Sequence, residues 1–216
     1  PTQNTLSLHD ALPIFGVEGR KGSLGSYYSV RDYCAVDPCL GTMEDFDAFV
    51  VEAHRLGMKV LLDWIANHTA RDARWVTEKP ASWYERDASG APAVPWDWTD
   101  TAKLNYAERE VWRAQGDAME FWVREHGVDG FRCDMAMLVP IEFWNETAQR
   151  LRRVKPDLFM LAEAEETYLF DGGAFDACFA WEMNHLMNDV AQQRVRVTSL
   201  RDYIYADRRR YPRSAM

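Results

Sequence analysis

The sequence lacks the features of disulfide-rich, metal-binding and membrane-spanning chains. Its four cysteines (Cys34, Cys39, Cys133 and Cys178) form no CxxC pair, so they indicate neither a zinc site nor a redox motif, and they leave the cellular compartment open. No apolar run approaches the roughly 20 residues of a membrane-spanning helix. No Gly-x-Ser-x-Gly segment is present, which sets aside a serine hydrolase of the open α/β-sheet type.

Positive charge is also scarce. The chain has 25 Lys and Arg residues against 34 Asp and Glu residues, a net charge of −9, and no basic stripe that could displace counterions from a phosphate backbone. A nucleic-acid partner is therefore not expected. The apolar fraction of 47% and the length of 216 residues are those of a globular protein with a substantial core.

The first residues differ in character from the rest. Residues 5–14 read TLSLHDALPI, which resembles one reading frame of a sequencing-library adapter. We therefore expect residues 1–15 to be a foreign segment outside the fold, and the domain to occupy residues 16–216. Such a segment would hide any native signal peptide, so the sequence gives no localisation.

From residue 16 onward, strand-like and helix-like patterns alternate. Thr42 and Asp45 predict a capping box, and the apolar stripe that follows, which includes Phe49 and Leu56, predicts a helix that ends at Gly57. Near-continuous apolar runs predict buried strands at 59–64, 130–134 and 158–162, with a short one near 178–179. Amphipathic patterns predict helices at 108–126, 140–154, 183–194 and 197–210.

This alternation predicts an α/β fold with a parallel sheet, either open and doubly wound or closed as a (β/α)8 barrel. Acidic residues stand where apolar runs end, at Asp63, Asp134 and Glu163. Because barrel enzymes gather their active-site residues from several strand ends, we favour a partial (β/α)8 (TIM) barrel. Residues 66–107 lack periodicity, which predicts a long loop or small inserted subdomain after the third strand.

The three strand-end carboxylates suggest a chemistry. Arg132 lies two residues before Asp134, so both side chains point to one side of a strand, and the guanidinium would keep a nucleophilic Asp134 ionised. Glu163 follows an apolar run whose desolvation would raise its pKa, as a general acid requires. Two carboxyl groups tuned in opposite directions are the minimum set for glycosidic bond cleavage. The alternative is that each is merely an exposed or ion-paired residue.

Four aromatic residues lie in the aperiodic segment, and their role stays open between stacking on sugars and packing of the loop. They are Trp83, Tyr84, Trp96 and Trp98.

Four ordered motifs in residues 16–216 resemble the α-amylase superfamily, glycoside hydrolase family thirteen. DWIANH at 63–68 resembles the family's first region, GFRCD at 130–134 the second, and LAEA at 161–164 the third. YSVRDY at 28–33 resembles the element that follows the second barrel strand.

This resemblance implies a retaining double displacement on α-glucosidic linkages of starch-like or maltooligosaccharide substrates. It implies that Asp134 is the nucleophile and Glu163 the acid/base, that Arg132 orients Asp134, and that Asp63 is the buried partner of Arg132 within the substrate site.

Three further roles follow from the resemblance alone. Tyr28 would stack beneath the sugar ring at the cleavage point, and His68 would hydrogen-bond the hydroxyls of that ring. Asn67 occupies a position that helps to bind a structural calcium ion in some members, although its oxygen could equally cap a loop. The chemistry itself requires no cofactor.

The sequence also departs from the family pattern. Residues 135–138, MAML, lack the Lys-His pair that follows the nucleophile in many α-amylases, which leaves amylase, cyclomaltodextrinase-like and transglycosylating activities open. The family's fourth region, with its third catalytic Asp, and the first barrel strand are not found. We therefore expect a truncated fragment that is inactive alone. The alternative is a non-catalytic amylase-like domain for carbohydrate binding or protein assembly, but such a domain is expected to lose Asp134 or Glu163.

Overall fold

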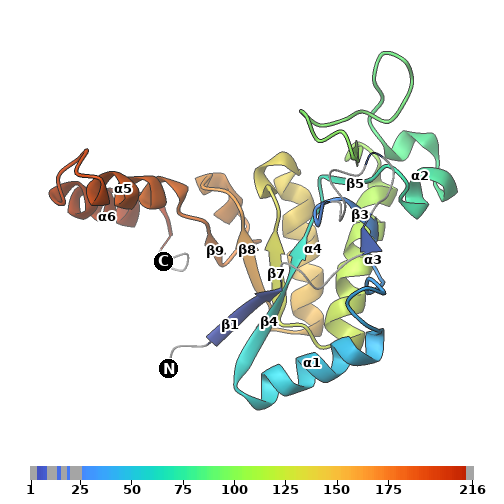
Figure 1. Ribbon diagram of the computed structural model, residues 1–216, viewed down its shortest axis with the longest axis horizontal. Helices are drawn as coiled ribbons and strands as arrows, with labels where there is room; N and C mark the ends of the chain where they lie inside the picture. The colour runs from blue at the N-terminus through green and yellow to red at the C-terminus, as the bar shows by residue number, and fades with distance from the viewer. Residues whose placement is uncertain (1–3, 9–13, 16–18, 20–25, 213–216) are drawn as a thin grey trace.

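The computed structural model describes residues 4–8, 14–15, 19 and 26–212. A five-stranded sheet with all neighbours parallel forms its centre, in the order β1-β4-β7-β8-β9 (Figure 1). The strands are β1 (Asn4–Leu8), β4 (Met58–Trp64), β7 (Gly130–Cys133), β8 (Phe159–Ala162) and β9 (Ala177–Cys178). Two short antiparallel pairs lie outside this sheet, and they join β2 (Ile14–Phe15) to β3 (Val30–Asp32) and β5 (His68–Ala70) to β6 (Thr101–Lys103).

Three helices cover one face of the sheet (Figure 1). They are α1 (Met43–Arg55), α3 (Arg109–Glu125) and α4 (Ile141–Val154), and their apolar sides meet the buried strands in one hydrophobic core. A doubly wound sheet would carry helices on both faces, whereas a barrel keeps them on its outer side. The one-sided arrangement is that of a partial (β/α)8 barrel, so the predicted fold class is confirmed.

The start of α1 forms as the sequence predicts. The Thr42 hydroxyl accepts from the backbone N–H of Asp45, and the Asp45 carboxylate accepts from the backbone N–H of Thr42 at 2.9 Å. The buried apolar stripe of α1 is narrower than the sequence predicts, because the side chains of Phe49 and Leu56 are exposed. Only the residues at i, i+4 and i+7 from Phe46 point directly at the sheet, while Phe49 and Leu56 lie on its flank.

Residues 66–107 form the excursion expected after strand β4. It contains β5, the short helix α2 (Arg74–Glu78), a 3-10 turn (Ala81–Trp83) and β6. A hydrophobic cluster of its own supports it, made of Trp83, Tyr84, Ala102 and Leu104 together with Val111 of α3. The excursion stands over the carboxyl ends of β4 and β7, where it can form one wall of a site (Figure 1).

The N-terminal segment does not lie wholly outside the sheet, contrary to the prediction for residues 1–15. β1 pairs in parallel with β4, from Asn4 opposite Met58 to Leu8 opposite Leu62. The pairing follows from the backbone, because an otherwise open strand edge offers hydrogen bonds to any extended segment. Residues 1–3 and 9–13 of the segment lie outside the described residues. Its foreign origin stays a prediction.

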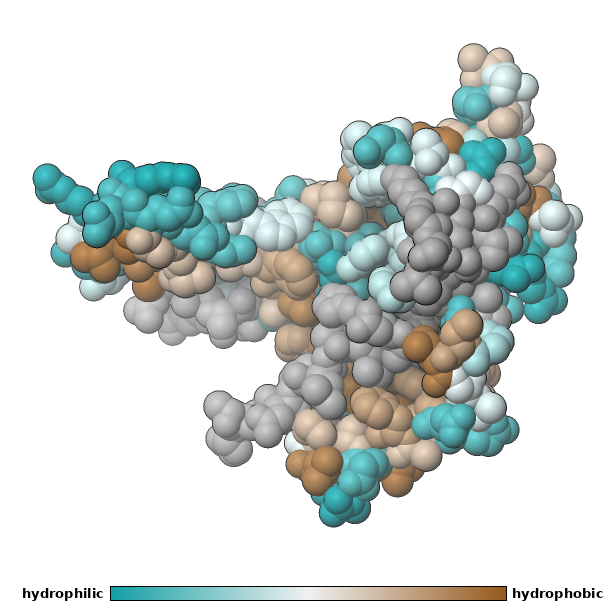
Figure 2. Space-filling model, viewed as in Figure 1, coloured by the Kyte–Doolittle hydropathy of each residue, from teal (hydrophilic) through white to brown (hydrophobic). Residues whose placement is uncertain are grey.

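Helices α5 (Trp181–Ala191) and α6 (Thr198–Arg210) project from the sheet as a two-helix arm (Figure 1). Hydrophobic residues line one side of this arm (Figure 2). Met187, Ile204 and Tyr205 of the two helices are exposed. Between residues 26 and 212, and in the shorter described pieces before them, no helix is long and apolar enough to cross a membrane.

The amino-terminal end of β7 is anchored by a buried carboxylate, Asp129, which is 3% exposed. It accepts from His54 Nε2 at 2.7 Å, Lys59 Nζ at 3.0 Å and the backbone N–H of Val60 at 2.9 Å, and it forms an ion pair with Lys155 Nζ at 2.7 Å. These partners come from α1, β4 and the end of α4. We call Asp129 and its three side-chain partners, His54, Lys59 and Lys155, the basal anchor.

Candidate active site

The register of the sheet brings the strand-end side chains together. Asp63 of β4 stands opposite Arg132 of β7. The ladders continue past the strands, since the backbone N–H of Asp134 donates to a β4 carbonyl at 2.9 Å and that of Glu163 to a β7 carbonyl at 3.0 Å. Three neighbouring parallel strands therefore present their polar residues at one edge of the sheet.

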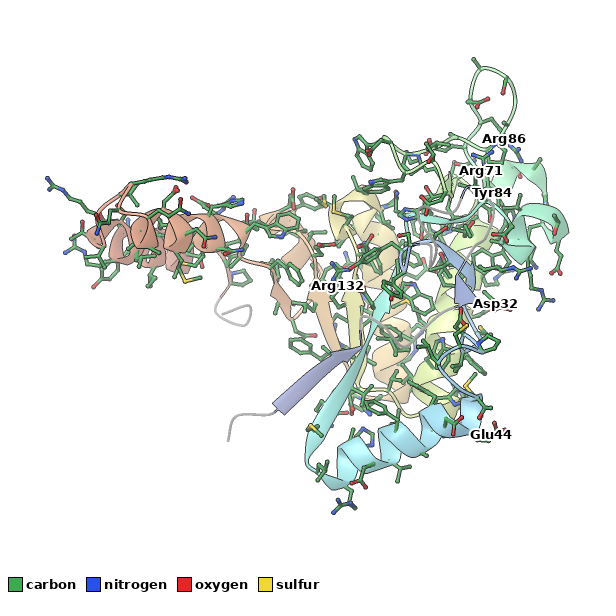
Figure 3. The ribbon with its side chains drawn as sticks, in the orientation of Figure 1. Asp32, Glu44, Arg71, Tyr84, Arg86 and Arg132 are labelled. Atoms are coloured by element: carbon green, nitrogen blue, oxygen red, sulfur yellow. The ribbon has the colours of Figure 1, made fainter. Side chains whose placement is uncertain are left out.

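The Arg132 guanidinium lies at the centre of this group (Figure 3) and is 4% exposed. Its Nη1 donates to Asp63 Oδ1 at 2.7 Å and to Asp134 Oδ1 at 2.9 Å, and its Nη2 lies 2.6 Å from Glu163 Oε2. The structure thus brings together all four residues. A planar, permanently charged guanidinium fixes the positions of the three carboxylates more rigidly than an ammonium group could.

One expectation about Asp134 is wrong. Burial raises the pKa of Asp134 to about 7, and the negative charge and hydrogen bond of Glu163 act in the same direction, while Arg132 lowers it. The sequence predicted that Arg132 would keep Asp134 fully ionised. One guanidinium shared among three carboxylates does not offset the burial of Asp134, so the pKa of Asp134 stays above its usual range.

The side chain of Glu163 is positioned by the turn that follows β7. Its Oε2 accepts from the backbone N–H of Met135 at 3.1 Å. Met135 has a φ of 41° and a ψ of 51°, a left-handed conformation that is strained for a side chain of this kind. The strained turn thus aims a backbone donor at the carboxylate, and Glu163 is more accessible than Asp134, at 17% against 8% side-chain exposure.

Tyr28, His68 and Asn67 form a hydrogen-bonded chain beside the carboxylates. His68 Nε2 donates to the Tyr28 carbonyl at 3.0 Å, and His68 Nδ1 accepts from the Asn67 amide at 3.1 Å. Burial lowers the pKa of His68 to about 4, so the ring is neutral. Both of its nitrogens have protein partners, and the contact of His68 with sugar hydroxyls stays a prediction. The Tyr28 ring is partly exposed and lies 5.7 Å from the Arg132 guanidinium carbon.

Calcium takes six to eight oxygen ligands, and Asn67 supplies one side-chain oxygen. Asn67 borders a cavity with Glu85 and Lys103, whose side chains form an ion pair at 2.9 Å. Across the described ranges, no group of three or more His, Cys, Asp or Glu residues could hold a metal ion.

A cavity of about 290 Å³ opens at this edge of the sheet, near the lower end of the range for small-molecule sites. Asp63 and Arg132 are not among its lining residues, so they act from beneath it. The lining combines the two remaining carboxylates with residues of the excursion and of the segment before β3: Ser26, Tyr28, His68, Trp98, Asp100, Thr101, Asp134, Met135 and Glu163.

Of the four aromatic residues in the excursion, two pack within the loop and two lie at or beside the cavity, where they could stack on sugars. Trp83 and Tyr84 are buried in its own hydrophobic cluster. Trp98 is half-buried and lines the cavity, with its ring centroid 5.1 Å from that of His68. Trp96 is 64% exposed and lies 4.7 Å from Trp98. Loop packing thus explains the first pair, and the second pair extends outward from the site.

Sequence reasoning missed four lining residues: Ser26, Asp100, Thr101 and Met135. Asp100 had a signal, because it follows Trp98 closely in a segment rich in aromatic and acidic residues. Met135 had none, since its contribution is a backbone N–H in an unusual conformation.

Comparison with known proteins gives a consistent set of relatives. The family profile described as "Alpha amylase, catalytic domain" matches residues 13–99 and 96–213. Alpha-amylase 3 of Dictyoglomus thermophilum is 32% identical over 180 residues, which cover 70% of this chain and 34% of that protein. The alpha-1,4-glucan:maltose-1-phosphate maltosyltransferase of Arcanobacterium haemolyticum is 35% identical over 154 residues, covering 66% of this chain and 22% of that protein.

Solved structures agree with the fold. The noncanonic maltogenic alpha-amylase AmyB from Thermotoga neapolitana superposes with a TM-score of 0.89 at 37% identity, covering 99% of this chain and 49% of that chain. The chain therefore spans about half the length of this solved relative, and about a third or less of the two curated relatives.

Proposed function

Because the chain belongs to the α-amylase family, we propose that it carries the nucleophile and the acid/base of a retaining enzyme that cleaves or transfers α-glucosidic bonds of α-glucans. The relatives include both hydrolases and a transferase, which supports this class. The observation that carries the proposal is the contact of one buried guanidinium with the carboxylates of Asp134 and Glu163.

This contact favours a retaining mechanism. Retaining enzymes hold their two carboxyl groups roughly 5 Å apart, whereas inverting enzymes separate them further to admit a water molecule. Here both carboxylates touch neighbouring nitrogens of Arg132, Asp134 Oδ1 at 2.9 Å and Glu163 Oε2 at 2.6 Å. Contact with a single guanidinium keeps the two carboxyl groups close together, as a retaining mechanism requires.

In the first step, the Asp134 carboxylate attacks the anomeric carbon and the bond from that carbon to the glycosidic oxygen breaks. Glu163 gives its proton to the departing oxygen, and a glycosyl ester of Asp134 forms. This step needs the proton on Glu163 and the negative charge on Asp134, and Arg132 favours the charged form of Asp134. Arg132 and Asp63 stay beneath and hold the nucleophile in position.

In the second step, Glu163 removes a proton from water or from an acceptor sugar, whose oxygen attacks the ester and releases Asp134. The apolar Met137 and Leu138 follow the nucleophile where many α-amylases have a Lys-His pair. We therefore expect acceptor binding on this side to differ from theirs, which leaves hydrolysis and transfer both possible.

Covalent trapping tests the proposal. In 2-deoxy-2-fluoroglucosyl fluoride of the α-configuration, fluoride leaves without protonation and the ring fluorine slows ester breakdown. Mass spectrometry of peptides should find the fluoroglucosyl group on Asp134. Glu163→Gln should still form the adduct but release it more slowly, and Asp134→Asn should form none. An adduct on another residue, or none in the unsubstituted chain, would refute the assignment.

Trapping suits this chain because it needs a single turnover. We expect the isolated chain to turn over little maltooligosaccharide, since the described part of its sheet is open at β1 and β9 and so does not close as a barrel. Hydrolysis at the rate of a complete family enzyme would contradict that expectation.

The proposed reaction requires no cofactor. A structural calcium ion near Asn67 stays a prediction, and a higher melting temperature with added calcium chloride, reversed by a chelator, would support it.

A further inference from the structure

A carboxylate that the proposed mechanism does not use also lines the cavity. Asp100 is 3% exposed, and its Oδ2 is one of the buried side-chain atoms that have no hydrogen-bond partner among the described residues. A buried acceptor left without a donor is costly, and native proteins keep few of them. Asp100 thus combines a buried acceptor that has no donor among the described residues with a place in the lining of the cavity that also contains Asp134 and Glu163.

The backbone around Asp100 is firmly held. The Ser29 hydroxyl donates to the Asp100 carbonyl at 2.8 Å. The next residue, Thr101, begins β6 opposite Ala70 of β5, and its N–H and hydroxyl both donate to the Trp98 carbonyl, at 2.9 Å and 2.8 Å. A carboxylate on such a support cannot easily turn away to find another partner, so its position is pre-organised.

The same turn presents an aromatic ring to the cavity. Trp98 packs against the buried ring of His68 at 5.1 Å and against Trp96 at 4.7 Å. Trp96 has a φ of 49°, a strained left-handed conformation for a bulky residue, which keeps its exposed ring beside Trp98. A pyranose ring has apolar C–H faces and a rim of hydroxyl donors. A flat indole with a neighbouring carboxylate is complementary to both.

We propose that Asp100 accepts a hydrogen bond from a hydroxyl of a bound α-glucan ring while Trp98 packs against the apolar face of that ring. The excursion then contributes substrate recognition, whereas the strand ends contribute the chemistry. This inference rests on the proposed function, because it takes the ligand to be an α-glucan. It makes Asp100 a specificity-determining residue with no part in bond cleavage.

Maltotriose binding, measured by isothermal titration calorimetry, tests the inference. Asp100→Asn keeps the side-chain shape but removes the charge, and it should raise the Kd about tenfold, the size expected for a hydrogen bond to a charged group. Trp98→Leu should weaken binding by a similar factor. Asp157→Asn is the matched control, because Asp157 is exposed and pairs with Lys59 away from the cavity, and it should leave the Kd unchanged.

Thermal unfolding separates recognition from a structural role. Since Oδ2 of Asp100 has no hydrogen-bond partner in the described part of the chain, Asp100→Asn should leave the melting temperature unchanged or raise it. If Asp100 only supports the fold, the variant will melt at a lower temperature and retain its affinity for maltotriose. That result would overturn the inference, as would an unchanged Kd at an unchanged melting temperature.

Monodeoxy maltosides identify the hydroxyl. On the unsubstituted chain, the maltoside that lacks this hydroxyl should bind about tenfold more weakly than maltose. On Asp100→Asn, the same maltoside and maltose should bind with equal affinity. Additive losses for every deoxy position would overturn the inference, and so would absence of maltotriose binding to the unsubstituted chain. Trapping on Asp134 reports separately on the proposed function, because it depends on the nucleophile and requires no contact with Asp100.

Discussion

Replacement of Asp129 by Asn should strongly destabilise the chain. The carboxylate is 3% exposed, and its three side-chain partners are more exposed, with side-chain values of 37% for His54, 34% for Lys59 and 21% for Lys155. An asparagine would face the two lysine cations with one acceptor oxygen and an amide N–H₂ that repels them. Breaking a buried ion pair costs about 3–5 kcal/mol, and because the cations can recover some hydration we expect the lower end, about 3 kcal/mol.

Urea unfolding followed by tryptophan fluorescence measures this loss. For a chain of this length, about 3 kcal/mol corresponds to a fall in melting temperature of roughly 6–12 °C. The control is Asp157→Asn, which removes an exposed carboxylate 3.5 Å from Lys59, the same lysine that pairs with Asp129. It should change stability by no more than about 0.5 kcal/mol. A loss below 1 kcal/mol for Asp129→Asn, or equal losses for both variants, would refute the reasoning.

The pH dependence gives a second check on Asp129. Burial alone would raise its pKa, but hydrogen bonds from Lys155, Val60, His54 and Lys59 outweigh burial and hold the pKa of Asp129 well below its usual range. The folded-state pKa thus lies below the unfolded value of about 3.9, so this stabilisation is complete above about pH 4 and is lost as the pH falls further. The difference in free energy of unfolding between the unsubstituted chain and Asp129→Asn should therefore be constant from about pH 5 to 8 and shrink below about pH 4.

Three further predictions concern the strands and the site. Gly130→Ala should cost about 3 kcal/mol in urea unfolding, because an added Cβ would lie 1.9 Å from the Phe159 carbonyl oxygen; a loss below 1 kcal/mol would contradict this. The pKa of His68 is about 4, below the unfolded value of about 6.5, so the unfolded chain binds protons first as the pH falls. Between those values His68 should lower stability by about 3 kcal/mol, and His68→Gln should abolish that part of the decline. Arg132→Met should raise the pKa of Asp134 above 7 in a carbon-13 NMR titration, since Arg132 lowers it; a lower pKa would contradict the electrostatic account.

Much of the fold could be predicted because its determinants are local. The Thr42–Asp45 capping box involves residues three apart, and the apolar runs at 59–64 and 130–134 indicate buried strands without reference to a partner. Parallel strands then bring the residues that follow them to one edge. The convergence of Asp63 and Glu163 on Arg132 was thus accessible from the sequence.

The remaining features depend on contacts between distant segments. The direction of the Asp134 pKa shift depends on how deeply it is buried and on how many carboxylates share Arg132, which no spacing reveals. The lone oxygen of Asp100 becomes visible only when all neighbouring donors have been placed. The sequence did not predict the pairing of β1 with β4, because residues 1–15 were interpreted as a foreign segment. The edge of a sheet can pair with any extended backbone, whatever the origin of that segment.

The length of β7 sets the distance between the basal anchor and the candidate active site. Asp129 and Asp134 flank its four residues, and at about 3.3 Å per residue they are separated by roughly 16 Å. The basal anchor fixes one end and Arg132 the other, so insertion or deletion of one residue would turn Arg132 to the opposite face of the sheet and displace Asp134. Length variation should therefore be tolerated in the excursion or the α5–α6 arm but not between these two aspartates. In a library of single-residue insertions across the chain, the soluble variants should include no insertion between Asp129 and Asp134.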